Sequence, residues 1–316
     1  MSVIVCTLFE NHYHYGLAAL INSLYAKGYR GEIYAGYKGN LPQWAENAKP
    51  NSEINWLNAN TLNVSEDLQI HFLPIEADVH LANYKPSFMK LLFTNMRTDI
   101  DGIVYFDPDI VIKCKWSFFE KWIGYGVALV HEIISNDMPQ THPIRKGWIE
   151  VAQKINREVT RTINSYINSG FCGVLRKDIE FLYLWEDIIN VAAVHYDLNK
   201  NRFIHSQDRS NLFFAHDQDA FNIAAMCCNC PVSEMGPEGM DFLQGGFTMS
   251  HAIGSPKPWN KKYLISSFKG INPTMADRGF WAYSTSPIRC YSDKTVKIKR
   301  ISISAAGFIG RFYSKK

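Results

Sequence analysis

Two carboxylates separated by one residue lie near the middle of the sequence, in Asp107-Pro108-Asp109. They follow the apolar run 102–106, which has the character of a buried strand. A turn at the end of that strand would bring both side chains to one divalent cation. Mg²⁺ or Mn²⁺ suits such oxygen ligands and often completes its coordination shell with substrate phosphate. The alternative is an ordinary turn, because Asp and Pro are both turn formers.

A second polar group lies in residues 251–259. His251 could supply a third, neutral ligand to the same cation. Gly254 permits close backbone approach to a phosphate, and Lys257 offers a compact positive charge for it. The alternative is a surface loop stiffened by its two prolines. The combination of three such residues at three-residue intervals favours a diphosphate site.

The third group is Asp217-Gln218-Asp219, at the start of an expected helix. Acidic residues at a helix N-terminus also cap the helix and complement its dipole, which accounts for one aspartate. Such a group could instead face the anomeric carbon of a sugar and stabilise a developing oxocarbenium ion.

The elements that must position these groups follow an α/β pattern. The chain begins with a βαβ unit, which favours a mainly parallel sheet with its ligand site at the C-terminal ends of the strands. Pro86 is interpreted as the first residue of a helix. We expect strands at 3–8, 32–37, 102–106, 110–114, 127–130 and 171–175, and helices at 14–27, 87–96, 148–162, 180–196 and 218–228.

Composition narrows the class of protein. A net charge of +3 over 316 residues is too small to indicate nucleic-acid binding. The N-terminus lacks the pattern of a signal peptide, and no apolar run approaches the roughly 20 residues that span a bilayer. Seven cysteines in apolar stretches fit reduced thiols and a cytoplasmic location. Cys227 and Cys230 form a C-x-x-C without a second pair, so they are interpreted as core thiols rather than zinc ligands.

Taken together and in this order, the motifs resemble those of family 8 glycosyltransferases, the retaining enzymes that include glycogenin and bacterial lipooligosaccharide galactosyltransferases. The resemblance extends from residue 3 to about residue 259. Asp107-Pro108-Asp109 is similar to the metal motif of the family, with Pro in place of the more usual Ala. Lys90 occupies the position of a basic residue that contacts the donor. The residues that resemble the nucleotide-binding first turn are Thr7, Leu8, Asn11 and Tyr13, with Gly16 opening the next helix.

The resemblance continues in the second half of the chain. Asn168-Ser169-Gly170 is similar to the family motif that contacts the donor sugar. Asp217-Gln218-Asp219 resembles the acidic loop beside the anomeric carbon. The closing motif, with a metal ligand and pyrophosphate contacts, is represented by His251, Gly254, Lys257 and Trp259.

This resemblance implies a single Rossmann-like, A-type glycosyltransferase domain over residues 1–290. Its nucleotide-binding half would cover about 1–130 and its acceptor-side half about 131–290. The implied activity is metal-dependent, retaining transfer of a hexose from a UDP-sugar to a glycan or lipid-linked acceptor, with Mn²⁺ or Mg²⁺, in the synthesis of cell-surface polysaccharide. Gln218, Asp219 and Asp217 would act at the sugar, by front-face attack or through a covalent intermediate. Residues 131–165 and 195–216 carry the loops expected to set acceptor specificity.

The remaining residues, 291–316, form a basic C-terminal tail. Basic side chains interleaved with Ile, Phe and Tyr suit an anionic membrane surface, which would place the protein at the inner face of the membrane. A solvated terminal segment is the alternative. The basic residues are Lys294, Lys297, Lys299, Arg300, Arg311, Lys315 and Lys316.

Two rival activities use the same diphosphate site. A nucleotide-sugar hydrolase or nucleotidyltransferase would not need Asn168-Ser169-Gly170 beside the sugar. A nucleotide-sugar-binding protein without turnover would not need Asp217-Gln218-Asp219.

Overall fold

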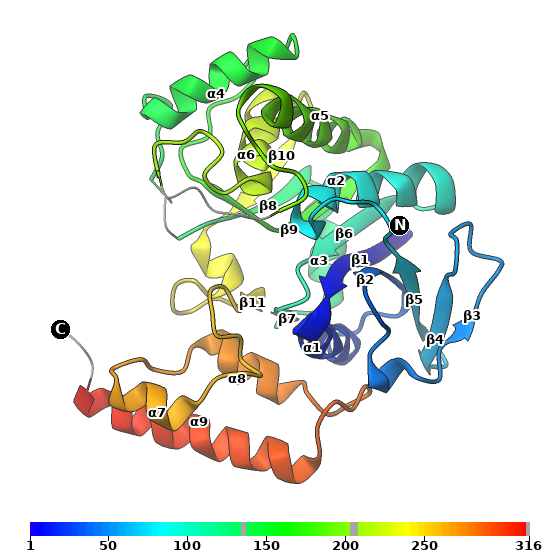
Figure 1. The fold of residues 1–316 in the computed structure, drawn as a ribbon, viewed down its shortest axis with the longest axis vertical. Helices are drawn as coiled ribbons and strands as arrows, with labels where there is room; N and C mark the ends of the chain where they lie inside the picture. The colour runs from blue at the N-terminus through cyan, green and yellow to red at the C-terminus, as the bar shows by residue number, and fades with distance from the viewer. Residues whose placement is uncertain (134–136, 203–207, 314–316) are drawn as a thin grey trace.

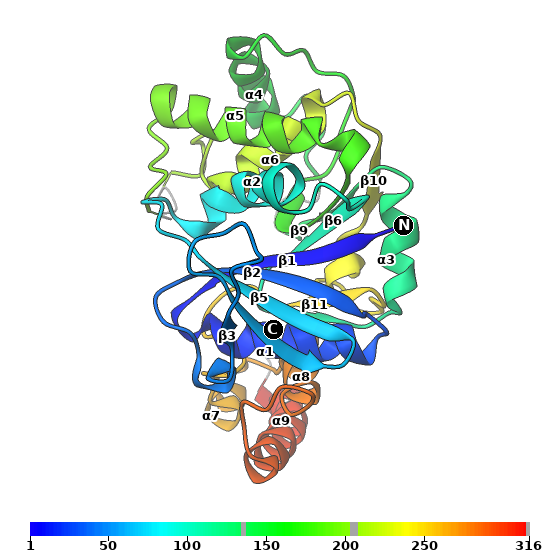
Figure 2. The same cartoon turned by 90° about the vertical axis from the view of Figure 1, so that its right-hand side faces the viewer.

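The computed structural model describes residues 1–133, 137–202 and 208–313, and a mixed sheet runs through the middle of it (Figures 1 and 2). Its strands are β1 (Val3–Glu10), β2 (Gly31–Lys38), β3 (Lys49–Pro50), β4 (Asn60–Ser65), β5 (Leu68–Pro74), β6 (Gly102–Phe106), β8 (Val127–His131), β9 (Ile167–Leu175) and β10 (Val232–Met235). Their order across the sheet is β10-β8-β9-β6-β1-β2-β5-β4-β3.

Most strands of this sheet run in one direction. β5, β2, β1 and β6 pair in parallel, and β10 pairs in parallel with β8. β9 is antiparallel to both β6 and β8, and β4 is antiparallel to β5 and β3. The predicted α/β fold with a mainly parallel central sheet is confirmed, and β9 is its main exception.

Helices cover both faces of the sheet, so the domain has three layers (Figure 2). They are α1 (His14–Ala26), α2 (Leu81–Leu91), α3 (Trp116–Ile123), α4 (Pro143–Lys154), α5 (Glu180–His195) and α6 (Asp217–Cys227). Short 3-10 helices lie at Asn11–Tyr13, Gln43–Ala45, Arg176–Asp178 and Pro237–Met240.

The alternation of side chains along β1 divides the apolar core between the two faces. Ile4, Cys6 and Leu8 join the core under α2, α4, α5 and α6, whereas Val5 and Phe9 join the core under α1 and α3. Successive strand residues point to opposite faces, so β1 is buried on both sides, as in doubly wound sheets.

Two predicted helix starts are wrong. α2 begins at Leu81 rather than at 87, and Pro86 lies inside it. A π-helical turn, Leu92–Met96, follows the end of α2. His80 caps this helix, because its Nδ1 accepts from the amide of Ala82 at 3.2 Å. Pro favours the first turn of a helix but does not by itself mark one. α4 spans Pro143–Lys154 rather than 148–162, with Pro143 in its first turn.

A small second sheet joins two distant parts of the chain. β7 (Ile110–Ile112) pairs antiparallel with β11 (Met249–His251), and His251 lies opposite Ile110. Lys113, directly after β7, donates to both carboxylate oxygens of Asp241. The pairing of β7 with β11 places His251 close to the end of β6.

Three helices, α7 (Tyr263–Phe268), α8 (Met275–Ala282) and α9 (Asp293–Tyr313), lie at one end of the molecule (Figure 1). α9 occupies most of the segment predicted as a tail, and it packs against α7 and α8 by burying Val296, Ile303 and Ala306. Lys315 and Lys316 lie outside the described residues. None of the helices in the described ranges is long and apolar enough to cross a membrane.

The segment before α9 is clamped to the start of the chain. The amide of Asn22, completely buried in α1, donates to the carbonyls of Tyr283 and Ile288 at 2.8 Å each, and its oxygen accepts from the amide of Ile288. Tyr15 and Tyr291 stack beside it with ring centroids 5.2 Å apart. The C-terminal helices are therefore held against α1 by specific contacts.

Candidate functional site

The C-terminal ends of β1, β6 and β8 meet at one edge of the sheet. Because β9 runs in the opposite direction, its first residues lie at the same edge. The amide of Asp107, directly after β6, donates to the carbonyl of Gly170 in β9 at 2.7 Å. A cleft of about 830 Å³ opens here, lined by Asp107 and Asp109 and by the first residues of β9.

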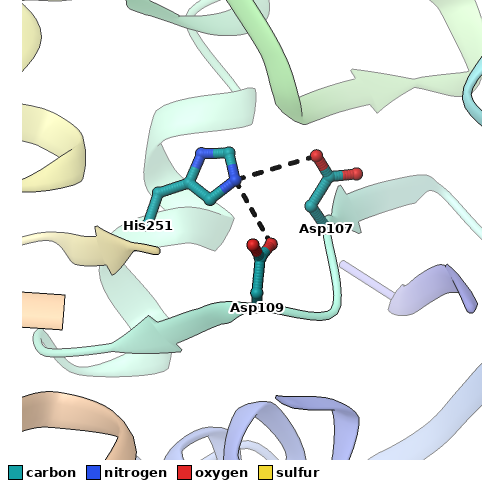
Figure 3. Close-up of side chains that lie close together, drawn as sticks. All are labelled: Asp107, Asp109 and His251. Atoms are coloured by element: carbon teal, nitrogen blue, oxygen red, sulfur yellow. Dashed lines mark ion pairs between the residues drawn. The ribbon is translucent and has the colours of Figure 1, made fainter. Parts of the chain in front are cut away.

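Asp107, Asp109 and His251 converge in this cleft (Figure 3). The Nε2 atom of His251 lies 3.3 Å from Asp109 Oδ1 and 3.8 Å from Asp107 Oδ2. One ligand atom from each residue lies within 4.8 Å of the other two. The pairing of β7 with β11 sets this geometry, and the amide of Ala252 donates to the carbonyl of Asp109 at 3.1 Å.

Gly170 is required by this arrangement. A Cβ atom at this position would lie 2.5 Å from His251 Cε1 and 3.0 Å from Asp107 Oδ2, too close for either contact. Gly16 in α1 has a similar role, since a Cβ there would lie 2.5 Å from the carbonyl oxygen of Pro108. Both glycines let the backbone approach the turn that carries the carboxylates.

The donor set fits a divalent cation such as Mn²⁺ or Mg²⁺. Two carboxylates and an imidazole are ligands that these ions accept. Burial by itself raises the pKa of Asp109, but His251 and Lys257 outweigh burial and hold that pKa well below its ordinary value. Asp109 is therefore ionised at neutral pH, as a metal ligand must be.

Lys257 lies on the other side of Asp109. Its Nζ atom donates to Asp109 Oδ2 at 2.6 Å and to the carbonyl of Ala252 at 2.7 Å. The same atom lies 5.6 Å from the ring centroid of Tyr13, which also lines the cleft. Gly254 lines the cleft with φ of +74°, a conformation that favours glycine.

Lys85 is the main residue that sequence reasoning missed. Its ammonium group is buried, 3.2 Å from Asp107 Oδ1 and 3.3 Å from Asp217 Oδ2, and it donates to the carbonyl of Ser169 at 3.1 Å. Burial lowers the pKa of Lys85, but Asp107 and Asp217 outweigh burial, so the net pKa is raised. One cation thus links the metal group to the acidic trio of α6.

Lys90, predicted to contact the donor, lies elsewhere. It pairs with Glu186 of α5, and its Nζ atom lies 4.8 Å from the ring centroid of Tyr183. It is not among the residues that line the cleft in the described chain. Both lysines belong to α2, but they are five positions apart along the helix, so they project about 140° apart.

The predicted trio Asp217-Gln218-Asp219 lines the cleft at the N-terminus of α6. Asp217 Oδ2 accepts from the hydroxyl of Ser169 at 2.7 Å, and Gln218 Oε1 accepts from the amide of Ser169 at 3.1 Å. Asn222, one turn further along α6, bonds to both the amide and the carbonyl of Ile167 in β9. These bonds fix α6 against the strand that carries Asn168 and Ser169.

Asp219 has a distinct environment. Its two oxygens accept from the hydroxyl of Tyr166 at 2.8 Å and from the amide of Ala215 at 2.5 Å. Burial raises its pKa from the ordinary value of 3.8 to about 7, although both hydrogen bonds oppose the rise. Near neutral pH this carboxyl group can exist in either protonation state.

Asn168 is oriented by two bonds. Its oxygen accepts from the amide of Gly170 at 2.8 Å, and its amide donates to Glu132 Oε2 at 2.6 Å. Glu132 is buried and lines the cleft, yet no sequence motif singled it out. It follows β8 directly, so its place at a strand end was the one available signal.

The predicted nucleotide-binding turn is only partly at the cleft. Leu8 and Tyr13 line it. Thr7 is completely buried in β1, and Asn11 is exposed in the following turn with φ of +48°. Neither Thr7 nor Asn11 is among the lining residues within the described chain. Trp259 packs edge-on against Tyr13, with ring centroids 5.8 Å apart.

Comparisons with known proteins bear on the fold. No protein-family model matches the chain, and no curated protein matches it significantly. Among solved structures, the apo structure of the bifunctional glycosyltransferase WbbM is similar, with a TM-score of 0.52 and 14% sequence identity. The match covers 95% of this chain and 52% of WbbM, so this chain spans about half of that protein. At this identity the match shows the fold alone, a glycosyltransferase fold, and not membership of family 8.

Proposed function

We propose that this protein is a metal-dependent glycosyltransferase that uses a UDP-sugar donor. The observation that carries the proposal is the convergence of Asp107, Asp109 and His251 in a cleft at the C-terminal edge of a glycosyltransferase fold. Ligands of open α/β sheets bind at this edge. A bound Mn²⁺ or Mg²⁺ would neutralise the pyrophosphate that departs from the donor.

The side chains around the metal group support this proposal. When the donor binds, the ammonium group of Lys257 could release Asp109 and contact a donor phosphate instead, since it binds either anion. Gly254 leaves its backbone accessible beside it. Lys85, Asn168 and Ser169 lie between the metal group and α6, where the sugar of the donor would have to lie. They would orient that sugar through its hydroxyl groups.

Asp217, Gln218 and Asp219 are proposed to act at the anomeric carbon, and transfer with retention is the stereochemical proposal. Asp217 is held in place by contacts with Lys85 and Ser169. Gln218 and Asp219 line the same cleft. Preorganised groups of this kind stabilise charge as it develops at the sugar. Both front-face attack and a covalent intermediate are compatible with this placement.

The acceptor is proposed to be a glycan or a lipid-linked glycan of cell-surface polysaccharide, reached at the inner face of a membrane. The support is the surface of α9, on which Phe308, Phe312 and Tyr313 are exposed. Basic residues lie on the same helix, as anionic lipid surfaces favour. Residues 1–290 are proposed as the catalytic domain, with about 1–130 and 131–290 as its nucleotide and acceptor halves.

The test is a donor panel with and without Mn²⁺. Purified protein is incubated with UDP-glucose, UDP-galactose and their N-acetylated forms, and released UDP is measured with and without a metal chelator. We expect metal-dependent release of UDP from one donor and retention of the anomeric configuration in the sugar product. Release of sugar 1-phosphate in place of UDP would instead show that the pyrophosphate bond is broken, as in diphosphate hydrolysis or nucleotidyl transfer.

A further inference from the structure

One wall of the cleft has a chemistry that the donor does not explain. The outer wall, defined as Met138, His142, Ile144, Arg209 and Phe214, lies at the α4 side of the cleft. Figures 1 and 2 place α4 at the opposite end of the molecule from α7, α8 and α9, with β7 and β11 between them. The metal group lies just before β7 and at the last residue of β11. A donor whose pyrophosphate lies at the metal group would leave this wall to the acceptor.

The outer wall is built from two segments locked together. The indole of Trp148 in α4 donates to the carbonyl of Leu212 at 2.8 Å. Leu212 also lies so close to Gly147 that a Cβ atom there would be 2.5 Å from it. Two turns held by the side chains of Asp208 and Asn211 fold the segment 208–214. The backbone that carries Arg209 and Phe214 is thus held against α4.

The polar groups of the outer wall are cationic or donors. Arg209 is exposed, with its guanidinium carbon 5.5 Å from the ring centroid of Phe214. The Nδ1 atom of His142 accepts from the amide of Ile144 at 3.2 Å, so the neutral ring carries its proton on Nε2, which is a donor.

Three carboxylates close to the outer wall in sequence have hydrogen-bond donors of their own. Asp208, next to Arg209, accepts from the amide and the hydroxyl of Ser210, and Asp217 accepts from the hydroxyl of Ser169. Glu132 accepts from Asn168 and from the amide of Ile133.

Arg145 is a buried positive charge behind the outer wall. Arg145, in the first turn of α4, is 1% exposed and donates to the carbonyls of Met138 at 2.6 Å and Ser165 at 2.5 Å. Its Nη1 atom is buried without a hydrogen-bond partner, and no ion pair to it is formed among the described residues. Burial lowers the pKa of Arg145 to about 10, which still leaves it charged at neutral pH. Glu234, which pairs with His131, interacts electrostatically with Arg145 without forming an ion pair to it, so the guanidinium still contributes positive charge on this side of the cleft.

We propose that the acceptor carries an anionic group, a phosphate or a carboxylate, that binds Arg209 and His142 at the outer wall. The apolar side of the acceptor sugar would pack on Phe214, while Arg209 offers its planar donors to the two oxygens of the anion. This inference rests on the proposed function, because it assigns the other end of the cleft to the donor. It narrows the acceptor from any glycan to an acidic one.

The test compares three soluble probes that differ in one substituent: glucose, glucose 6-phosphate and glucuronate. Each is titrated calorimetrically into wild-type protein, with UDP and Mn²⁺ present and without them. We expect at least one acidic probe to bind about tenfold or more tightly than glucose, since charge-assisted hydrogen bonds are about twice as strong as neutral ones. A preference for glucose 6-phosphate would indicate a phosphorylated acceptor, and a preference for glucuronate would indicate a uronic acid.

The matched variants are Arg209→Gln in the wall and Arg289→Gln on the exposed surface before α9. Arg209→Gln should remove the preference for the acidic probe without changing the affinity for UDP, and Arg289→Gln should leave both unchanged. Equal binding of glucose and both acidic probes would overturn the inference, as would a preference that survives in Arg209→Gln. Absence of UDP binding by the wild type would count against the proposed function instead, and the titrations without UDP would still decide the acidic preference.

Discussion

The metal end of the cleft and the C-terminal helices hold their charged side chains in opposite ways. At the metal end, Lys85, Asp109 and Lys257 are buried or nearly so, and each contacts at least two polar partners. On α9, Lys294, Lys297 and Arg311 are exposed, whereas Arg300 donates to two backbone carbonyls of α8. Apolar side chains are exposed on the same helix, including Phe308 at 60% and Phe312 at 73%. Fixed charges suit a site that must meet developing charge without reorganising. Exposed ones suit a surface that adapts to its partner.

The largest effect expected from this comparison is at the metal group. Asp109→Asn keeps the size of the side chain but removes the charge that His251 and Lys257 contact. We expect metal-dependent UDP binding to be lost and turnover to fall by about a thousandfold or more. Asp107→Asn and His251→Ala should be similarly damaging. Mn²⁺ affinity measured by calorimetry, beside circular dichroism to verify folding, separates this result from unfolding.

The second prediction uses the two lysines of α2 as a matched pair. Lys85→Met leaves Asp107 and Asp217 facing each other without their shared cation, so turnover should fall by about a hundredfold and the melting temperature should drop. Lys90→Met removes a pair with Glu186 whose side chains are 21% and 22% exposed, and it should change turnover less than about threefold. An equal loss of turnover in the two variants would show that the contacts of Lys85 with Asp107 and Asp217 do not contribute to catalysis.

The third prediction concerns pH. The carboxyl of Asp219, with its pKa near 7, ionises as the pH rises from 6 to 8. If its carboxylate acts at the sugar, turnover should rise over this range. The Asp219→Asn variant should turn over more slowly, and its turnover should not change with pH over the same range. Because the folded state keeps this proton to higher pH than the unfolded state, the free energy of unfolding should fall as the pH rises from about 4 to about 7. That fall should be reduced in Asp219→Asn.

The smallest effect on catalysis is expected at α9. Phe308→Ser with Phe312→Ser should leave UDP release unchanged while reducing sedimentation with anionic liposomes. Removing residues 294–316 is a poorer test, because it would expose the core that Val296, Ile303 and Ala306 cover. Equal sedimentation of the double variant and the wild type, at low and at high salt, would argue that the exposed face does not bind lipid.

How much of the site the sequence predicts depends on whether a residue lies at a strand end. Asp107 and Asp109 follow an apolar strand whose predicted bounds, 102–106, are those of β6. The end of such a strand is where ligands bind, so the prediction needed no tertiary information. Asn168 and Ser169 are brought to the same place only because β9 is antiparallel, which no local pattern indicates.

Lys85 shows what local patterns cannot supply. The resemblance to family 8 assigns the donor contact to Lys90, and Lys85 lies outside the helix that is predicted to start at Pro86. The true cap, His80, is an unusual one, and the helix runs through the proline. Which face of α2 meets the cleft is decided by its packing on α5 and β1, and tertiary packing of this kind overrides propensity.

The clamp formed by Asn22 has a consequence for how the chain matures during synthesis. Its partners, Tyr283 and Ile288, are more than 250 residues further along the chain. Until these two residues leave the ribosome, the side chain of Asn22 lacks the protein partners of its three hydrogen bonds. The face of α1 that carries Asn22 is exposed during that time. At synthesis rates of about 5–20 residues per second, at least about ten seconds pass between the synthesis of α1 and that of the segment that covers it. A nascent chain stalled before residue 283 should therefore remain sensitive to protease in α1, long after β1 and β2 have emerged.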